Sequence, residues 1–460
     1  MASRTFPTQP KTVKPVKTAF RTIKTQIPVP ESLPILESLR AHEPLSMSGQ
    51  PAILWDSAVG CAVKDRWGNQ WLDWSSGVLV TNAGHGRKEI VDAIIKQASA
   101  PLLHNYCFPN EPRAALSKYL TEIAPAPLKK CFLLTTGAET TECAIKLAKT
   151  HGLKVGGPKK DVIVTFEHAF HGRTLASQLA GGIPALKTWI TREHADFVQV
   201  PFPGDWRLKP EQQTFAAFEK ALAAKGIAPE NVAGVMSETY QGGSVAFQPA
   251  DFAQALRAWC TKHNVVMICD EVQAGFGRCG TLFGFEHYGI VPDLICCGKG
   301  ISSSLPLSCV LGKPEIMDLY GPGEMTSTHT GNPICSAAAL ANVKLIVGEK
   351  LAANSAARGE ELLAGLEKIC ARHAAHVGAI KGKGLVAGVH CIKPGTTDPD
   401  PNLAFAVVER AIEKGLLLFG PVGFKGGTIK ICPPLIITRD QLVDGLAAFG
   451  EAMDEAVGGH

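Results

Sequence analysis

The sequence lacks an apolar run long enough to cross a membrane, and its cysteines lack the spacing of a metal or redox motif. No apolar stretch reaches the roughly 18 residues that a membrane span needs, and none of the 14 cysteines belongs to a Cys-x-x-Cys pair. Several cysteines lie within apolar runs, as in LICCGK at 294–299. We therefore expect no membrane partner and no bound metal, and we interpret the cysteines as buried thiols of a reducing compartment.

An excess of one charge is also missing. The 46 lysines and arginines nearly balance the 42 aspartates and glutamates, so the net charge is only +4 over 460 residues. No basic run is interleaved with aromatic residues, which argues against a nucleic-acid partner. Because 45% of the residues are hydrophobic, the chain can bury a large core. We expect two or three domains and a small-molecule substrate.

Acidic residues are absent from the first 30 positions, which hold six basic residues and five prolines. A basic, acid-free start is typical of a mitochondrial transit peptide. The prolines, however, would interrupt the amphipathic helix that such a peptide forms. We therefore favour an extended arm that lies on the body of the protein or on a partner subunit, and a cytoplasmic protein over one of the mitochondrial matrix.

Apolar, β-branched segments alternate with helical patterns through the middle of the chain. The near-continuous apolar character of these segments predicts an α/β fold with a largely parallel sheet covered by helices on both faces. Ligands should then bind beyond the carboxyl ends of the strands. The predicted strands are 131–136, 161–166, 232–238, 264–270, 293–299 and 307–312, and two of the intervening helices are 141–152 and 249–264.

Smaller elements flank this region. Residues 52–56 and 70–74 suggest an N-terminal hairpin or meander, and residues 384–392 and 427–437 suggest a second, smaller sheet. We expect residues 1–85 to form an N-terminal arm and a segment of the small domain. Residues 86–345 would form a large domain, and residues 346–460 a C-terminal small domain.

Four motifs fall where predicted strands end. The first, LLTTGAETTECAIKLAK at 133–149, contains a capping box of Thr136 and Glu139. Gly137 and Ala138 would then expose the first backbone N–H groups of a helix. Such a terminus favours a phosphate, although a capping box also begins many helices that bind nothing.

The second motif, FEHAFHGRT at 166–174, contains an aromatic residue and an arginine close together. Phe170 could stack on a planar ring, and Arg173 could meet a carboxylate. The alternatives are a phenylalanine of the core and an arginine in a surface ion pair. His168 and His171 do not predict a metal site, because no third ligand accompanies them.

The third motif, NVVMICDEVQ at 264–273, is an apolar strand that ends in Asp270 and Glu271. A strand-end acid holds magnesium in some nucleotide hydrolases, but this chain has no Gly-x-x-x-x-Gly-Lys-Ser/Thr loop. Because side chains alternate along a strand, we expect only Asp270 to face a ligand, where a carboxylate suits a buried cation. Glu271 would then be structural.

The fourth motif, DLICCGKG at 293–300, brings Lys299 directly after a strand. A lysine there would lose water, which lowers its pKa and exposes a nucleophilic amine. A lone lysine more commonly extends to solvent. A helix terminus for a phosphate, an aromatic ring, a strand-end aspartate and a strand-end lysine are together what a pyridoxal phosphate site needs.

From about Ala52 to Leu435 the sequence resembles the class III aminotransferases, the pyridoxal-phosphate enzymes of fold type I that include 4-aminobutyrate and ornithine aminotransferases. The longest agreement is DEVQAGFGRCGTLFGFEHYGIVPDLICCGKG at 270–300. TTGAETTE, AFHGRT, NAGHGRKEIVDAI and THTGNP agree as well. The resemblance implies a large domain with a mostly parallel central sheet flanked by helices, together with a smaller α+β domain.

The resemblance also implies a role for each cofactor residue. Lys299 would bond to the cofactor and then serve as the base that moves the substrate proton, and Asp270 would pair with the pyridine nitrogen. Thr328 would reach the phosphate of a neighbouring subunit, which implies a homodimer, or a dimer of dimers, with active sites at the subunit interface. The remaining cofactor positions are Gly137 and Ala138 at the phosphate, Phe170 on the ring, Gln273 at the phenolic oxygen, His171 and Glu238.

By the same resemblance, Val78, Arg173 and Lys430 are substrate residues, and two positions depart from the family's pattern. Many ω-aminotransferases have Glu-Pro-x-Gln-Gly-Glu, whose last glutamate pairs with a movable arginine near the C-terminus. Here ETYQGGS at 238–244 puts Gly243 at that glutamate, and TIKICPPL at 428–435 puts Lys430 at that arginine. A lysine attracts a carboxylate as a point charge but lacks the two-pronged hydrogen bonding that fixes its orientation.

The function implied is a transaminase that moves an amino group from an amine or amino acid to a 2-oxo acid, such as pyruvate or 2-oxoglutarate. Because the Glu/Arg pair is changed, an amino-acid racemase or epimerase, or a dialkylglycine-type decarboxylase of the same family, is the alternative. A non-catalytic protein that keeps the fold is disfavoured, because Lys299, Asp270 and Gln273 are all present.

Overall fold

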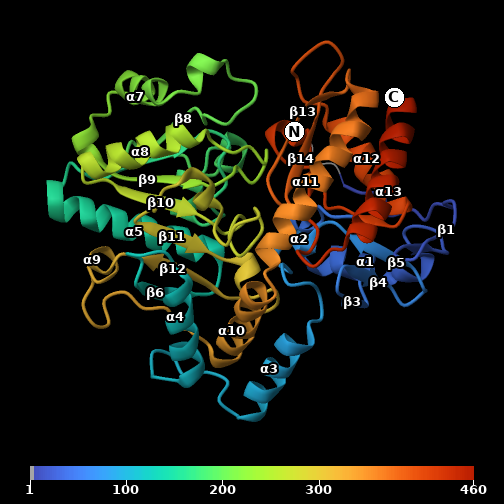
Figure 1. The fold of residues 1–460 in the computed structure, drawn as a ribbon, viewed down its shortest axis with the longest axis horizontal. Coiled ribbons are helices and arrows are strands. Elements are labelled where there is room, and N and C mark those ends of the chain that lie inside the picture. Colours follow the sequence, from blue (N-terminus) through green and yellow to red (C-terminus); the bar gives the residue numbers. More distant parts are fainter. Residues whose placement is uncertain (1–4, 460) are drawn as a thin grey trace. The chain divides into compact units, whose positions relative to one another are not determined.

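The structure is a computed structural model that describes residues 5–459 of the chain. The chain divides into two compact units (Figure 1). Residues 88–353 form one, here called the large unit, and residues 1–87 with 354–460 form the other, called the small unit. The large unit continues past residue 345 because the whole of helix α10 (Pro333–Gly348) packs on α3 and α4 of that unit.

The large unit is built on a seven-stranded sheet in the order β6-β12-β11-β10-β9-β7-β8. The strands from β11 to β8 run parallel, and β12 is antiparallel to both of its neighbours. The expectation of a largely parallel sheet is thus confirmed, and the sequence pattern missed only the short edge strand β8. The strands are β6 (Lys130–Leu134), β7 (Val162–Phe166), β8 (Phe197–Val200), β9 (Val232–Glu238), β10 (Val266–Asp270), β11 (Leu294–Cys297) and β12 (Ser308–Gly312).

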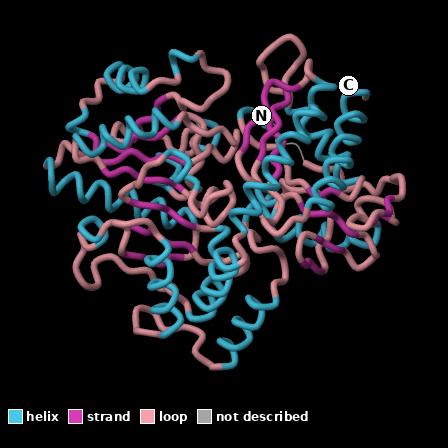
Figure 2. The backbone as a smooth tube through the Cα atoms, in the orientation of Figure 1, coloured by secondary structure: helices cyan, strands magenta, loops and turns pink. Residues whose placement is uncertain are grey.

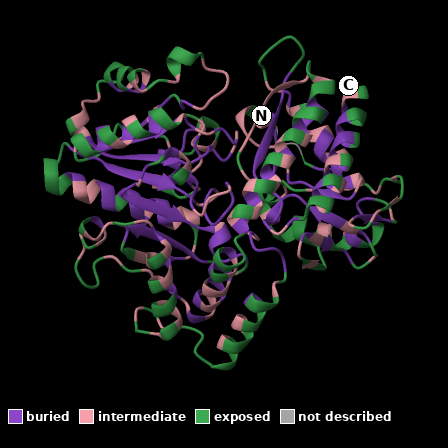
Figure 3. Cartoon of the chain, viewed as in Figure 1, coloured by how far each residue is buried: buried purple, intermediate pink, exposed green. Residues whose placement is uncertain are grey.

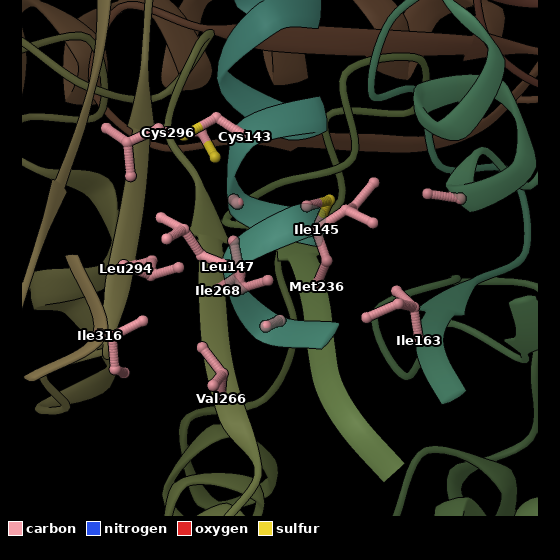
Figure 4. Close-up of a cluster of buried hydrophobic side chains, with 14 of the residues drawn as sticks. Cys143, Ile145, Leu147, Ile163, Met236, Val266, Ile268, Leu294, Cys296 and Ile316 are labelled. Atoms are coloured by element: carbon pink, nitrogen blue, oxygen red, sulfur yellow. The ribbon is translucent and has the colours of Figure 1, made fainter. Parts of the chain in front are cut away.

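Helices cover both faces of this sheet, whose strands are almost wholly buried (Figures 2 and 3). Helix α5 packs on β9, β10, β11 and β12, and its buried face joins the aliphatic side chains of those strands in one core cluster (Figure 4). The helices of this unit are α3 (Lys88–Ser99), α4 (Glu111–Ile123), α5 (Gly137–Gly156), α6 (Leu175–Ala180), α7 (Phe215–Ala224), α8 (Ala250–Lys262), α9 (Pro314–Met317) and α10.

Aromatic rings fill the opposite side of the sheet. Phe166 of β7 lies with its ring centroid 6.3 Å from Phe252 of α8 and 6.3 Å from Phe218 of α7. Ile163 of the same strand belongs to the core cluster that packs on α5. Because successive side chains of a strand point to opposite faces, this alternation places α5 on one side of the sheet and α7 and α8 on the other.

The small unit contains two sheets. A six-stranded sheet joins β1 (Val16–Lys17), β2 (Thr22–Ile23), β3 (Ser57–Val59), β4 (Ala62–Lys64), β5 (Gln70–Asp73) and β15 (Leu416–Leu417), and a three-stranded sheet joins β13 (Val377–Gly382), β14 (Ala387–Cys391) and β16 (Thr428–Ile431). The helices are α1 (Leu33–His42), α2 (Ser76–Leu79), α11 (Leu351–Cys370), which begins just before the unit does, α12 (Pro401–Glu413) and α13 (Arg439–Gly458).

One strand predicted in this unit is wrong. Residues 52–56 are irregular, and the hairpin begins at Ser57, where β3 starts to pair with β4. The apolar character of the segment has another cause, because Ile53 packs against a core cluster that includes Trp71 and Ile412. The apolar run therefore reflects partial burial of Ile53 rather than a strand.

The basic N-terminal arm is part of the small unit. Its strands β1 and β2 pair with each other, and β2 pairs with β5. Arg21 is buried and donates from Nε and Nη2 to Asp444 at 2.6 and 2.9 Å, and from Nη1 to the Lys414 carbonyl at 2.7 Å. The arm thus lies on the body of the protein, one of the two arrangements expected for it.

The structure also describes the cysteines and the longest helices. All 14 cysteines are free thiols, and most of them are buried. Within residues 5–459, no helix has both the length and the apolar character that crossing a membrane requires.

Candidate functional site

The register of three parallel strands determines where the polar residues of the site gather. In the sheet, Asp270 at the end of β10 is the partner of Glu238 at the end of β9 and of Cys296 in β11. Lys299 follows β11 by two residues. Since parallel strands end at the same edge of a sheet, two acids and a lysine meet at the carboxyl edge of the large unit's sheet.

The N-terminus of α5 contributes backbone N–H groups to this edge. Thr136 caps the helix by accepting a hydrogen bond from the Glu139 N–H at 3.3 Å, and the Glu139 carboxylate accepts from the Thr136 N–H at 2.9 Å. A Cβ at Gly137 would lie 2.8 Å from Val272 Cγ1, so the first turn leaves no room for a side chain there. The predicted capping box is present, and it leaves the helix terminus open toward the cavity.

Asp270 and His171 form a buried pair. His171 Nδ1 lies 2.8 Å from Asp270 Oδ2, and the Val272 N–H donates to Asp270 Oδ1 at 3.0 Å. Burial alone would lower the pKa of His171, but the hydrogen bond and charge of Asp270, with the charge of Glu238, raise it above the ordinary 6.5. The other ring nitrogen, Nε2, has no hydrogen-bond partner among the described residues.

Glu238 is a second buried acid beside this pair. Its carboxylate accepts hydrogen bonds from the Phe170 N–H at 3.0 Å and the Gly242 N–H at 2.8 Å. Burial raises the pKa of Glu238 to about 7, with a contribution from the charge of Asp270, while His171 and the two N–H donors oppose the rise. Glu238 can therefore gain or lose a proton near neutral pH.

Lys299 extends from a constrained backbone. It begins a single 3-10 turn, Lys299–Ile301, with φ of 44°, a left-handed conformation that is uncommon for residues other than glycine. Burial lowers the pKa of the Lys299 amine below its ordinary 10.5, and the charges of Asp270 and Glu238 only partly oppose this. The amine thus loses its proton more readily than that of a solvated lysine.

These residues line one cavity of about 140 Å³. It brings together eight of the nine predicted cofactor residues with three that the sequence analysis did not select. The lining consists of Gly137, Ala138, Phe170, His171, Gly172, Glu238, Tyr240, Asp270, Val272, Gln273 and Lys299. Its chemistry combines a helix N-terminus suited to an anion, a buried carboxylate paired with an imidazole, and an amine of lowered pKa.

The other predicted residues lie elsewhere. Thr328, the ninth cofactor residue, is exposed on a surface loop of the large unit. Arg173 is exposed, with its guanidinium carbon 5.6 Å from the centroid of the Phe170 ring that lines the cavity. Val78 and Lys430 belong to the small unit, where Val78 is 40% exposed and Lys430, on β16, is 2% exposed.

Glu271, the acid next to Asp270, has the structural role expected for it. It is fully buried and accepts hydrogen bonds from the N–H groups of Gly284 at 2.7 Å and Phe285 at 3.0 Å, and from the Thr239 hydroxyl. It therefore holds the chain that follows the strand and does not line the cavity.

Three cavity residues were missed. A Cβ at Gly172 would lie 2.8 Å from that of Ala138, and φ of Gly172 is 136°, so the loop approaches α5 in a way that requires glycine. Val272 lies two positions after Asp270, and that spacing could have indicated it. Tyr240 lies two residues after β9 in an isolated β-bridge with Phe247, and no local pattern in the sequence points to it.

The part of the chain that the structure describes offers no candidate metal site. Among residues 5–459, no group of three or more histidine, cysteine, aspartate or glutamate side chains is arranged to hold a metal ion. His168 and His171, the closest pair in the sequence motif, have separate environments. His171 pairs with Asp270, whereas burial lowers the pKa of His168.

Comparisons of the sequence and of the structure with known proteins all find aminotransferases. The family model for class-III aminotransferases matches residues 46–453. A 4-aminobutyrate aminotransferase of Mycobacterium leprae is 33% identical over 93% of this chain and 96% of its own length. A 5-aminovalerate aminotransferase of Pseudomonas aeruginosa is 32% identical over 92% of this chain and 98% of its own. The structure of an amine transaminase from an uncultivated Pseudomonas species, in a PLP-bound form, matches 90% of this chain and 97% of its own with a TM-score of 0.82 and 26% identity.

The His171–Asp270 pair makes a prediction about titration. In an Asp270→Asn variant the buried imidazole loses its negative partner, so burial should dominate and the pKa of His171 should fall below 6.5. Histidine-selective NMR titration of the cofactor-free protein measures this pKa. Because the folded-state pKa of the wild-type His171 is raised, the pair adds stability that is complete below pH 6.5 and is lost as the pH rises through the raised value. Urea unfolding at several pH values should show that the variant lacks this dependence.

Asp454→Asn provides the matched control, because it removes the acid of a different pair, His373 Nε2 to Asp454 Oδ1 at 2.6 Å, in the small unit. That variant should leave the titration of His171 unchanged. An unshifted His171 in the Asp270→Asn protein would contradict the account of the buried pair.

Proposed function

The chain belongs to the class-III aminotransferases, which act with pyridoxal phosphate, and we propose that the cavity around Lys299 is where it holds that cofactor. Each part of the cofactor has a chemical counterpart in the lining. The open terminus of α5 suits the phosphate, Asp270 suits the pyridine nitrogen, and the Lys299 amine suits the aldehyde. The partnerless Nε2 of buried His171 further supports a polar occupant.

When bound, pyridoxal phosphate supplies an aldehyde that takes up the amino group and a ring that accepts electrons from the substrate carbon. Lys299 has two tasks in this proposal. Its amine, with a pKa lowered by burial, would be the nucleophile toward the aldehyde, and Nζ would also hold and return the proton of the substrate carbon. In this role Lys299 would be a catalytic residue, because its amine would touch both the cofactor and the substrate.

Asp270 is the second catalytic residue. Its carboxylate would keep a proton on the ring nitrogen, and this maintains the ring as an electron acceptor. His171 orients the carboxylate through the 2.8 Å contact, and the Val272 N–H holds its second oxygen. Gln273 would contact the phenolic oxygen, with Glu238 nearby as an acid whose pKa of about 7 lets it follow the protonation of that side of the ring.

For the substrate, we propose an amino acid whose carboxylate is remote from the reacting amine. Two relatives are named for 4-aminobutyrate and 5-aminovalerate, and both compounds have this form. Arg173 supports the proposal, because its guanidinium is exposed above a ring that lines the cavity. By resemblance we also propose Val78 and Lys430 as substrate residues, with Lys430 attracting a carboxylate, that of pyruvate or 2-oxoglutarate, as a point charge.

We also propose that the protein is a homodimer, or a dimer of dimers, whose sites are completed across the interface. Apolar side chains are exposed on the large unit: Val91 and Ile95 of α3 are 42% and 59% exposed, and Leu103 and Phe108 are 55% and 73% exposed. A surface of this kind is typical of a contact with another protein. Thr328 is exposed in the same unit and could supply its hydroxyl to the phosphate held by the second copy.

For the compartment, we propose the cytoplasm. The free state of all 14 cysteines supports a reducing environment, since paired cysteines would be expected in an oxidising one.

The half-reaction tests transamination against its alternative. With 4-aminobutyrate and no 2-oxo acid, the holoenzyme should convert its bound cofactor once, with one equivalent of product, and then stop. Adding pyruvate or 2-oxoglutarate should restore turnover, because the amino group then has an acceptor. Absorption spectroscopy and product quantification follow both stages. With a chiral α-amino acid or a dialkylglycine in place of 4-aminobutyrate, sustained product formation without an acceptor would instead indicate racemisation or decarboxylation.

Arg173→Gln tests the carboxylate contact. Losing a charge-assisted pair of about 1.5–3 kcal/mol should lower kcat/KM for 4-aminobutyrate roughly 10- to 100-fold. Butylamine, which has the same chain length but no carboxylate, is the matched substrate control and should react at an unchanged rate. Equal losses for the two donors would show that Arg173 does not contact the carboxylate.

A further inference from the structure

The exposed loop that carries Thr328 is fastened at several points to another segment of the large unit. Residues 326–332 lie against residues 103–113, which precede and begin α4. Three side-chain hydrogen bonds cross between the segments: Tyr106 Oη to Thr326 Oγ1 at 3.0 Å, Asn332 Nδ2 to the Leu103 carbonyl at 2.7 Å, and Asn110 Nδ2 to the Gly331 carbonyl at 3.5 Å. We call these two segments and their contacts the clasp.

Arg113 lies at the centre of the clasp. Its guanidinium donates to the carbonyls of Tyr106 at 3.3 Å and Cys107 at 3.1 Å, while its own N–H is bound by Asn110 Oδ1 at 2.8 Å. Its aliphatic stem lies against Gly331. A single side chain therefore fixes the turn at 106–107 and contacts the loop that follows Thr328.

The contact between Arg113 and Gly331 leaves no spare room. A Cβ at Gly331 would lie 2.2 Å from Arg113 Cδ and 2.4 Å from Cγ, and φ of Gly331 is 54°. Both the left-handed backbone and the close approach of the stem require glycine at this position. The loop can thus pack on Arg113 in this conformation only because position 331 has no side chain.

Residues on both sides of Thr328 form hydrogen bonds within the large unit, whereas the hydroxyl of Thr328 forms none among the described residues. Before it, Thr326 is bound by Tyr106, and after it, Thr330 is buried and donates to the Leu133 carbonyl at 2.6 Å. Among residues 5–459, no hydrogen bond of the structure engages the Thr328 hydroxyl, which is exposed. A free loop would lose about 1–2 kcal/mol of backbone entropy for each residue ordered on binding. The clasp orders these residues before any ligand arrives.

We propose that Arg113 is a positioning residue for cofactor binding: through the clasp it holds Thr328 where its hydroxyl can bond to the phosphate in a second copy of the chain. The inference rests on the proposed dimeric site. It adds a residue that does not touch the cofactor, and it assigns a ligand-binding purpose to the contacts of the 103–113 segment. Preorganisation of this kind improves affinity by removing an ordering cost rather than by adding a contact.

The test compares two cofactors that differ only in the phosphate. Dissociation constants of pyridoxal phosphate and of pyridoxal are measured on the full-length cofactor-free protein by absorption titration. Thr328→Ala should weaken pyridoxal phosphate roughly tenfold, since one hydrogen bond to a charged group is lost, and leave pyridoxal nearly unchanged. Arg113→Ala should weaken pyridoxal phosphate by about three- to tenfold with the same selectivity, and the double variant should be no weaker than Thr328→Ala alone.

Two further variants keep the test decisive. Lys118→Ala removes an exposed cation of the same helix, paired with Glu122, and should leave both constants unchanged. Tyr106→Phe removes only the hydroxyl that bonds to Thr326, so it preserves the fold if Arg113→Ala does not, and it should cause a smaller loss confined to pyridoxal phosphate.

Each contrary outcome has a distinct meaning. If Arg113→Ala weakens both cofactors equally, or if its effect adds fully to that of Thr328→Ala, Arg113 supports the fold only and the proposal is wrong. If Thr328→Ala shows no selectivity for the phosphate, the proposed dimeric site fails and this inference fails with it. If Thr328→Ala is selective but Arg113→Ala and Tyr106→Phe have no effect, the clasp alone is refuted.

Discussion

The hydrogen bond between His171 and Asp270 is the contact on which the rest of the site depends. An ionised carboxylate inside a protein is costly unless donors surround it. Asp270 has two donors, the imidazole of His171 on one oxygen and the Val272 N–H on the other. The parallel register of β9, β10 and β11 then brings Glu238 and Lys299 to the same edge of the sheet. The fold thus provides a buried, oriented negative charge beside an amine, and transamination with pyridoxal phosphate requires both.

The electrostatic balance of the cavity is shared among its members. Burial raises the pKa of Glu238 to about 7 and lowers that of Lys299, so the acid keeps its proton more readily, and the amine loses its proton more readily, than the same groups in water. The pKa of His171 is raised, because two acids face it. Opposite shifts within one cavity are typical of catalytic sites, where each group must have the protonation state that its task needs. Arg173 and Thr328 lie outside this buried group, and in our account they contact the substrate and the second copy of the chain.

Much of the fold and of the cofactor cavity could be predicted from the sequence, because the decisive residues follow apolar strands directly. Asp270 and Lys299 were selected as candidates because they follow strands, and Gly137 because it follows a strand and lies in a capping box; the combination of these motifs and the family resemblance then gave their roles. Such prediction failed where tertiary contacts, rather than the local sequence, determine the conformation of a segment or bring a residue to the cavity. Residues 52–56 are irregular although apolar, with Ile53 packed on a core cluster, and Tyr240 reaches the cavity from an isolated β-bridge beyond the end of β9. The packing of Arg113 against Gly331 joins residues far apart in the sequence, and no local pattern encodes it.

The central claim is that Lys299 is the residue that bonds to pyridoxal phosphate in this cavity. Borohydride reduction of the holoenzyme, followed by proteolysis and mass spectrometry, tests it most directly, because reduction makes the bond between lysine and cofactor permanent. The account predicts loss of the visible absorption band and one cofactor mass on the peptide that contains Lys299. A colourless protein that takes up no cofactor, or a cofactor fixed to a different lysine, would contradict it.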